Sequence, residues 1–207
     1  MCIRDWAYVV GSLDRGVVAR DIFDTLLAEH GDDTGLLLDI ANLAIDQDDL
    51  ERAADFYVMV VDLNEADTDA NNDDNNKDML VAAGVWYSNQ SVGRYDDALE
   101  VLDRAADLEL IPTDGTMLNR LRAYYNYAKE TKTQSEAETD PVLKQELTDK
   151  ANGLFDRTIE IGVAMTNNFP ANANGFFYLS LAQLETGDYD ASDANFKTYQ
   201  ELSPDTP

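Results

Sequence analysis

The sequence predicts an all-α protein built as a solenoid of stacked antiparallel helix hairpins. Three observations support this prediction. The chain matches itself after a shift of 34 residues, each matching segment has the apolar spacing of two amphipathic helices, and a short polar turn separates the two helices. One hairpin cannot bury its apolar face alone, so neighbouring hairpins must stack and share a continuous core.

The first two units are in the same register along most of their length. Each has a cluster of apolar residues before a polar turn and another cluster after it, and the turns read "GSLDRG" and "DQDDLE". Small residues sit where the helices must approach closely, and large ones fill the gaps between them. The positions that coincide after the shift are Trp6, Ala7, Val10, Ala19, Phe23 and Leu26 in the first unit, and Ile40, Ala41, Ala44, Ala53, Tyr57 and Val60 in the second.

Two later segments show the same pattern with a clearer turn. In "LVAAGVWYSNQSVGRYDDALEVLDRA" the turn places Tyr95 two residues after Gly93, and in "FFYLSLAQLETGDYDASDANFKTYQELSP" it places Tyr189 two residues after Gly187. The spacing of 34 residues and the order of small and large residues resemble the tetratricopeptide repeat family. The last segment departs from the family pattern at three positions, where polar residues replace small or aromatic ones: Ser180, Gln183 and Ser192.

This resemblance implies a right-handed α-solenoid, with one repeat domain over residues 1–207. We expect five repeats and an acidic inter-repeat loop over 67–77. The first unit starts almost at residue 1 and the chain ends just after Pro204, with no polar capping helix at either end. These ends predict that the chain is a fragment of a longer one. The expected repeats cover about 1–33, 34–66, 77–112, 115–170 and 173–206.

The fourth unit is expanded. Residues 115–134 form one predicted helix, and a polar, acidic loop follows. Asp140 and Pro141 then form a helix start, because aspartate caps the first turn and proline is tolerated within it. The apolar series that follows extends to about Thr166, which predicts a helix roughly 40 Å long. We therefore expect this hairpin to project beyond its neighbours.

The charge balance excludes several classes of function. The 41 acidic residues against 15 basic ones give a net charge of −26, which repels nucleic acid and anionic lipid. No apolar run approaches the roughly 18 residues of a membrane span, so no membrane insertion is expected. A single cysteine, Cys2, excludes an intramolecular disulfide, and a single histidine, His30, disfavours a catalytic dyad. We predict no enzyme activity, and a bacterial-type cytoplasm or periplasm would both suit the chain.

The most acidic stretch, "DTDANNDDNNKD" over 67–78, has two interpretations. Its oxygen-bearing residues fall where an EF-hand loop places its calcium ligands. However, Asn72 stands where the sharp turn needs glycine, and Asp78 is shorter than the usual bidentate glutamate. A hydrated joint between repeats is therefore the preferred interpretation, a weak Ca²⁺ site is the alternative, and no other cofactor is expected. The ligands of that alternative site would be Asp67, Asp69, Asn71, Asp73 and Asp78.

The resemblance also implies a concave groove lined by the first helix of each repeat. Apolar residues on these helix faces predict a scaffold that binds a protein or peptide segment, with apolar anchors and flanking Lys or Arg on the partner. Asn42 suits the carboxylate-binding pattern known in some members, but the Lys and Arg anchors of that pattern are missing. The alternative function is a structural or cation-responsive spacer. The predicted groove residues are Leu38, Asn42, Val81, Val85, Phe177, Tyr178 and Leu181.

Overall fold

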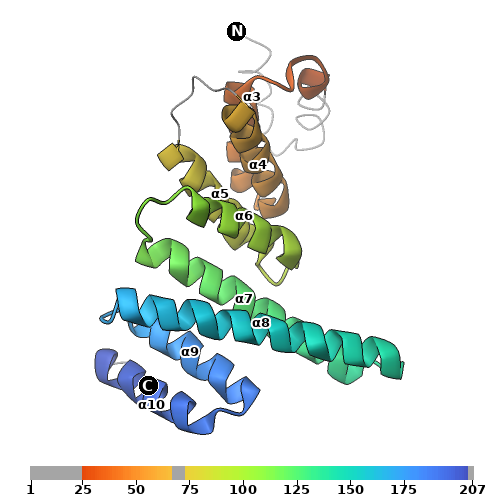
Figure 1. Cartoon of the computed structure of the whole chain (residues 1–207). Helices are drawn as coiled ribbons and strands as arrows, with labels where there is room; N and C mark the ends of the chain where they lie inside the picture. The colour runs from red at the N-terminus through yellow and green to blue at the C-terminus, as the bar shows by residue number, and fades with distance from the viewer. Residues whose placement is uncertain (1–24, 67–72, 205–207) are drawn as a thin grey trace. The chain divides into compact units, whose positions relative to one another are not determined.

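The computed structural model describes residues 25–66 and 73–204, and every regular element in those ranges is an α-helix (Figure 1). The chain divides into two compact units, and the boundary lies between Gly93 and Arg94. The repeat positions predicted at Trp6, Ala7, Val10, Ala19 and Phe23 lie outside the described residues. The prediction of one continuous domain over 1–207 stays a prediction.

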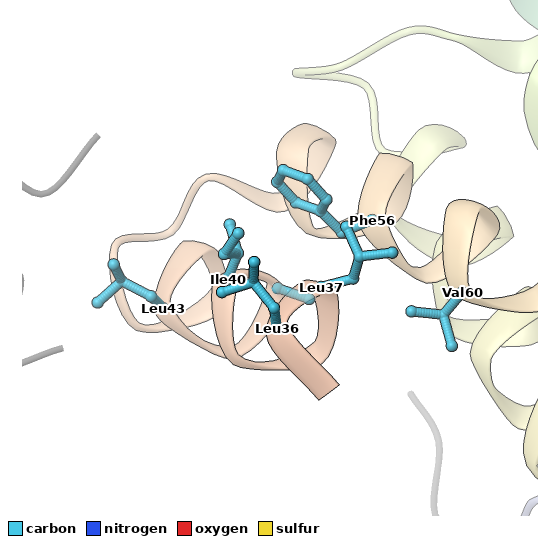
Figure 2. Close-up of a cluster of buried hydrophobic side chains, with 7 residues drawn as sticks. Leu36, Leu37, Ile40, Leu43, Phe56 and Val60 are labelled. Carbon is cyan, nitrogen blue, oxygen red and sulfur yellow. The ribbon is translucent and has the colours of Figure 1, made fainter. Parts of the chain in front are cut away.

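In the first unit, a helix that includes residues 25–30 precedes three further helices. These are α3 (Thr34–Asp46), α4 (Leu50–Ala66) and α5 (Asp73–Tyr87), and α4 packs against both α3 and α5. The core between α3 and α4 consists of large aliphatic side chains and one aromatic ring (Figure 2). Of the apolar positions predicted in the repeat over 34–66, Tyr57 is partly buried and the others are buried: Ile40, Ala41, Ala44, Ala53 and Val60. The buried residues of this cluster are Leu36, Leu37, Ile40, Ala41, Leu43, Phe56 and Val60.

The turn between α3 and α4 lies where "DQDDLE" predicted it. Asp33 caps α3 by accepting a hydrogen bond from the Leu36 amide at 3.1 Å. After α3, Asp48 takes a left-handed conformation with φ of 58°, which aspartate tolerates better than most residues. The Asp49 carboxylate then accepts from the Arg52 amide at 3.4 Å, so the backbone turn at Asp48 follows α3 and a polar side chain starts α4.

Helix α5 starts earlier than the acidic stretch suggested. It begins at Asp73, inside the loop predicted over 67–77. Asn76, only 3% exposed, accepts a 2.8 Å hydrogen bond from the amide of Asn64 on α4. This hydrogen bond holds the first turns of α5 against α4, because the buried Asn76 amide would be costly without a partner.

The second unit contains five helices in its described part. They are α6 (Tyr95–Asp107), α7 (Asp114–Ala137), α8 (Pro141–Asn168), α9 (Ala173–Thr186) and α10 (Tyr189–Leu202). Each packs on the next, and α7 also packs on α9. Gly162 allows the close approach of α8 to α9, since a Cβ there would lie 3.1 Å from Cβ of Leu179.

The expanded hairpin has the predicted form. Helix α8 starts at Pro141, and the Asp140 carboxylate accepts from the amides of Val142 and Leu143. It is 28 residues long, about 42 Å at 1.5 Å per residue, and α7 has 24 residues. Both helices extend beyond the ends of α9 and α10 (Figure 1). Only three residues, 138–140, join α7 to α8.

Candidate protein-binding surface

Helix α9 carries an apolar stripe of Phe177, Leu181 and Leu184, called here the α9 stripe. The spacings of four and three residues place these side chains on one side of the helix. Leu184 is 49% exposed, and Phe177 and Leu181 are partly buried. Phe177 and Leu181 were predicted from the sequence but Leu184 was not, although its spacing of three from Leu181 was the signal that would have found it.

The α9 stripe rests on a series of aromatic contacts that involves all four helices from α7 to α10. On α9, the Phe177 and Tyr178 rings have centroids 5.4 Å apart. Tyr178 then meets Tyr125 of α7 at 5.7 Å, and Tyr125 meets the 1% exposed Phe155 of α8 at 6.1 Å. On the other side, Phe177 lies 5.0 Å from Tyr199 of α10. These contacts fix the base of the stripe, and Tyr178 belongs more to the core than the groove prediction assumed.

A cluster of charges lies where α7 meets α9. The Glu185 carboxylate accepts from Lys129 at 2.8 Å and from Lys132 at 2.7 Å, and its side chain is only 16% exposed. Burial acts to raise the pKa of Glu185, but hydrogen bonds from the two lysines outweigh it and the pKa is lowered. The ionised carboxylate therefore links both cations of α7 to α9 at neutral pH.

The three polar departures from the repeat pattern join α9 to α10. Ser192 Oγ donates to the carbonyl oxygen of Ser180 at 2.8 Å, and Asn195 Nδ2 donates to Gln183 Oε1 at 2.8 Å. Ser180, Gln183 and Ser192 are all buried. Hydrogen bonds thus replace the small and aromatic packing expected at these positions. We call these four residues the α9–α10 polar clasp.

The other predicted groove residues belong to the first unit. On α3, Leu38 is partly buried against the core and Asn42 is exposed. On α5, Val81 is partly buried and Val85 is 37% exposed. Each pair is separated by four residues, so each helix presents its pair on one face. The groove prediction therefore involves α3 and α5 in the first unit and α9 in the second.

The candidate cation site remains a prediction. Asp67, Asp69 and Asn71 lie outside the described residues, and Asp73 is the first residue of α5. Asp78 is exposed on the same helix, with Oδ1 3.8 Å from Lys77 Nζ, so a cation already faces it. Over 25–66 and 73–204 no group of three or more His, Cys, Asp or Glu side chains is placed to hold a metal ion.

The fold is similar to that of solved tetratricopeptide-repeat proteins. YrrB, a TPR protein with an unusual peptide-binding site, matches with a TM-score of 0.59 and 14% identity, over 98% of this chain and 86% of that chain. One structure of MamA AMB-1 matches with 0.59 and 15%, over 99% and 92%, and another with 0.57 and 16%, over 97% and 96%. No protein-family model and no curated protein matches the sequence.

These similarities confirm the predicted class. The chain has the tetratricopeptide-repeat fold, an all-α solenoid of helix hairpins. At such low identities the similarity shows the fold, and the fold alone does not locate a binding site. No helix in the described part of the chain has the length and apolar character needed to cross a membrane.

Proposed function

We propose that this protein is a non-enzymatic scaffold that binds a peptide or protein segment. The binding faces are the exposed faces of α3, α5 and α9, each of which is the first helix of its repeat. Two facts support the proposal. The fold is one that presents helix faces to partners, and YrrB, a similar structure, has a peptide-binding site. The proposal concerns this chain's own groove residues rather than those of YrrB.

The observation that carries the proposal is the α9 stripe. Leu184 is 49% exposed beside the partly buried Phe177 and Leu181, and the aromatic contacts beneath them hold the helix in place. An apolar surface on a fixed base loses little conformational freedom on binding, so it suits a ligand's apolar anchors. On α5, Val85 gives a similar accessible apolar position.

The charge of the chain defines the rest of the ligand. A net charge of −26 attracts Lys and Arg and repels acidic peptides. Apolar anchors would supply most of the affinity, and the basic residues would mainly raise the association rate. We therefore propose a ligand with apolar anchors spaced along a helix or an extended segment, flanked by Lys or Arg.

A library of random peptides displayed on phage tests this proposal, because it samples many ligand sequences at once and does not require an identified partner. The wild-type chain is the bait, and L181S/L184S is the variant that removes the exposed Leu184 and the partly buried Leu181 of the stripe. The matched control is V142S/L143S, which likewise replaces two apolar residues by serine, at positions at the start of α8 that are 65% and 49% exposed. Circular dichroism first confirms that all three proteins fold.

We expect peptides rich in apolar and basic residues to be enriched on the wild type and on the control. Their affinity for L181S/L184S should fall by about tenfold or more, because two apolar anchors lose their contacts. Equal affinity for all three proteins would show that the stripe is not the binding surface. Enrichment of acidic peptides would contradict the proposed ligand chemistry.

A further inference from the structure

Helix α10 has the same sequence pattern as α6, an earlier helix of the same unit. One surface of α6 is covered by another helix. Helix α6 begins with Tyr95 and Asp96, and α10 begins with Tyr189 and Asp190, each pair just after a turn glycine. Seven residues after each tyrosine comes a large apolar residue, Leu102 in α6 and Phe196 in α10. The two helices are therefore equivalent positions of the repeat, and α6 shows what such a helix surface can bind.

The α6 surface is covered by α7. The ring of Tyr127 on α7 stacks on Tyr95, with centroids 5.1 Å apart and planes 12° apart. Its hydroxyl lies 2.8 Å from both carboxylate oxygens of Asp96, to which it donates. Burial raises the pKa of the Tyr127 phenol, so at neutral pH it keeps its proton. Lys150 of α8 lies over the Tyr127 ring and 3.6 Å from Asp96 Oδ1.

Because α7 covers this surface of α6, the side chains on it are buried. Tyr95 is 9% exposed and Leu102 is fully buried. At the equivalent positions of α10, Tyr189 is 65% exposed and Phe196 is 40% exposed. Two other residues of α10 face α9. Ser192 contacts it through the polar clasp, and Tyr199 contacts the Phe177 ring. Tyr189 and Phe196, seven residues apart, therefore form one accessible stripe beside the α9 interface.

We infer that this α10 stripe is a docking site for an amphipathic helix of a partner protein, distinct from the α9 stripe. By equivalence with α7, the docking helix would place an aromatic ring on Tyr189 and a hydrogen-bond donor or cation at Asp190. Charge complementarity points the same way, because Asp188, Asp190 and Asp193 are all exposed at this end of α10. The occupant is therefore a helix with an aromatic and apolar stripe and a basic residue near the aromatic one.

One difference between the α6 and α10 surfaces restricts the sequence of the partner helix. On α6, Asp103 accepts from Arg120 Nε at 2.8 Å and from the Tyr124 hydroxyl at 2.9 Å. Asp103 lies eight residues after Tyr95 in α6. The residue eight positions after Tyr189 in α10 is Lys197. An arginine at the place of Arg120 would be repelled there. The partner helix should carry an acidic residue at that position.

The probe for this site is the helix that covers the equivalent surface. It is a fluorescein-labelled peptide of residues 113–131 with the change R120E, and fluorescence anisotropy measures its binding to the full chain. Y189A is the test variant, since Tyr189 is 65% exposed and its loss should leave the fold intact. L181S/L184S is the control that changes two of the three residues of the α9 stripe and leaves the α10 stripe intact.

We expect the R120E peptide to bind the wild type, and the affinity to fall about tenfold with Y189A. A peptide carrying Y127A should lose affinity to a similar degree. The peptide that keeps Arg120 should bind about threefold more weakly than the R120E peptide, and K197D should reverse that preference. Affinity for L181S/L184S should stay unchanged, so failure of the α9 proposal leaves this result intact.

Three results would overturn the inference. The peptide could fail to bind at millimolar concentration, or bind Y189A as well as the wild type. Light scattering could instead show that the chain alone is a dimer that Y189A dissociates, in which case a second copy covers α10. Circular dichroism and the melting temperature of Y189A provide the check that the variant is folded.

Discussion

Thr131 on α7 and Thr158 on α8 are both buried threonines with different hydrogen bonding. Thr158 is 0% exposed, and its hydroxyl donates to the Leu154 carbonyl at 2.8 Å. Thr131 is 1% exposed, and among the buried side-chain polar atoms of the described residues only its Oγ1 has no hydrogen-bond partner. A buried hydroxyl without a partner keeps its desolvation cost, so the two positions should respond oppositely to the same substitution.

We predict that T131V stabilises the protein by about 1 kcal/mol, because valine has nearly the same shape and removes the unpaired hydroxyl. T158V should destabilise it by about 1 kcal/mol, because a hydrogen bond is lost there. Urea unfolding followed by circular dichroism measures both. Destabilisation by T131V would indicate that its hydroxyl has a partner, such as an internal water.

Glu185 gives a prediction on pH. Its pKa is lowered in the folded protein from the usual value of 4.5, so its ion pairs stabilise the fold above that value. The contribution disappears as the pH falls through the lower, folded pKa. E185Q should therefore cost about 1 kcal/mol at about pH 7, and progressively less as the pH falls through the folded pKa. A cost that is independent of pH would show that the ionised carboxylate is not what holds α7 to α9.

At the scale of helices, the sequence predicted the features that are determined by a few neighbouring residues. Gly93 and Gly187 have φ of 69° and 86°, a left-handed conformation that glycine adopts without strain. The Asp140–Pro141 helix start combines a side-chain cap with a fixed φ, and α8 begins there. Both signals depend on neighbouring residues only, so sequence alone is sufficient to locate them.

The features that sequence missed depend on contacts between helices. The polar run before Met79 looked like loop, but Asn76 is buried against Asn64 of α4, and α5 starts at Asp73. In the last hairpin, Gln183 looked like a tolerated departure, yet it pairs with Asn195 of α10. A buried amide and an exposed one have the same local sequence signal, so only the partner across the interface separates them.

The α9–α10 polar clasp yields a prediction at this scale. N195A removes the donor to Gln183, which is only 7% exposed, and should destabilise the protein by about 1–3 kcal/mol. The double change Q183L/N195L replaces both partners by apolar groups and should recover most of that loss. A double-mutant cycle of Q183L, N195L and Q183L/N195L in urea provides the measurement. Additive effects of the single changes would show that the two amides do not act together.

At the scale of the whole chain, charge is the dominant global property. The net charge of −26 comes from 41 acidic residues against 15 basic ones. The described ion pairs include those of Glu185, Asp103 and Asp96. Like charges on a folded surface repel one another, and the unfolded chain relieves part of that repulsion by expanding. The fold is therefore expected to be stabilised by ions that screen the charge.

We predict that the melting temperature rises when the salt concentration increases from about 10 mM to about 0.5 M, because the screening length falls from roughly 30 Å to a few ångströms. Sodium chloride and potassium chloride should act alike, since screening depends on ionic strength. Thermal unfolding followed by circular dichroism gives the measurement. A melting temperature that does not change with salt would mean that self-repulsion contributes little to the stability of this fold.

The same experiment with divalent ions tests the two interpretations of residues 67–78. If the stretch is a joint, Ca²⁺ and Mg²⁺ at equal ionic strength should raise the melting temperature by the same amount, through screening alone. D67N/D69N should then be neutral or slightly stabilising, because it removes two like charges. A calcium site would instead give a larger shift with Ca²⁺ than with Mg²⁺, since calcium accepts more oxygen ligands in a looser geometry. The loss of that excess in D67N/D69N would establish the site and make the chain a cation-responsive protein.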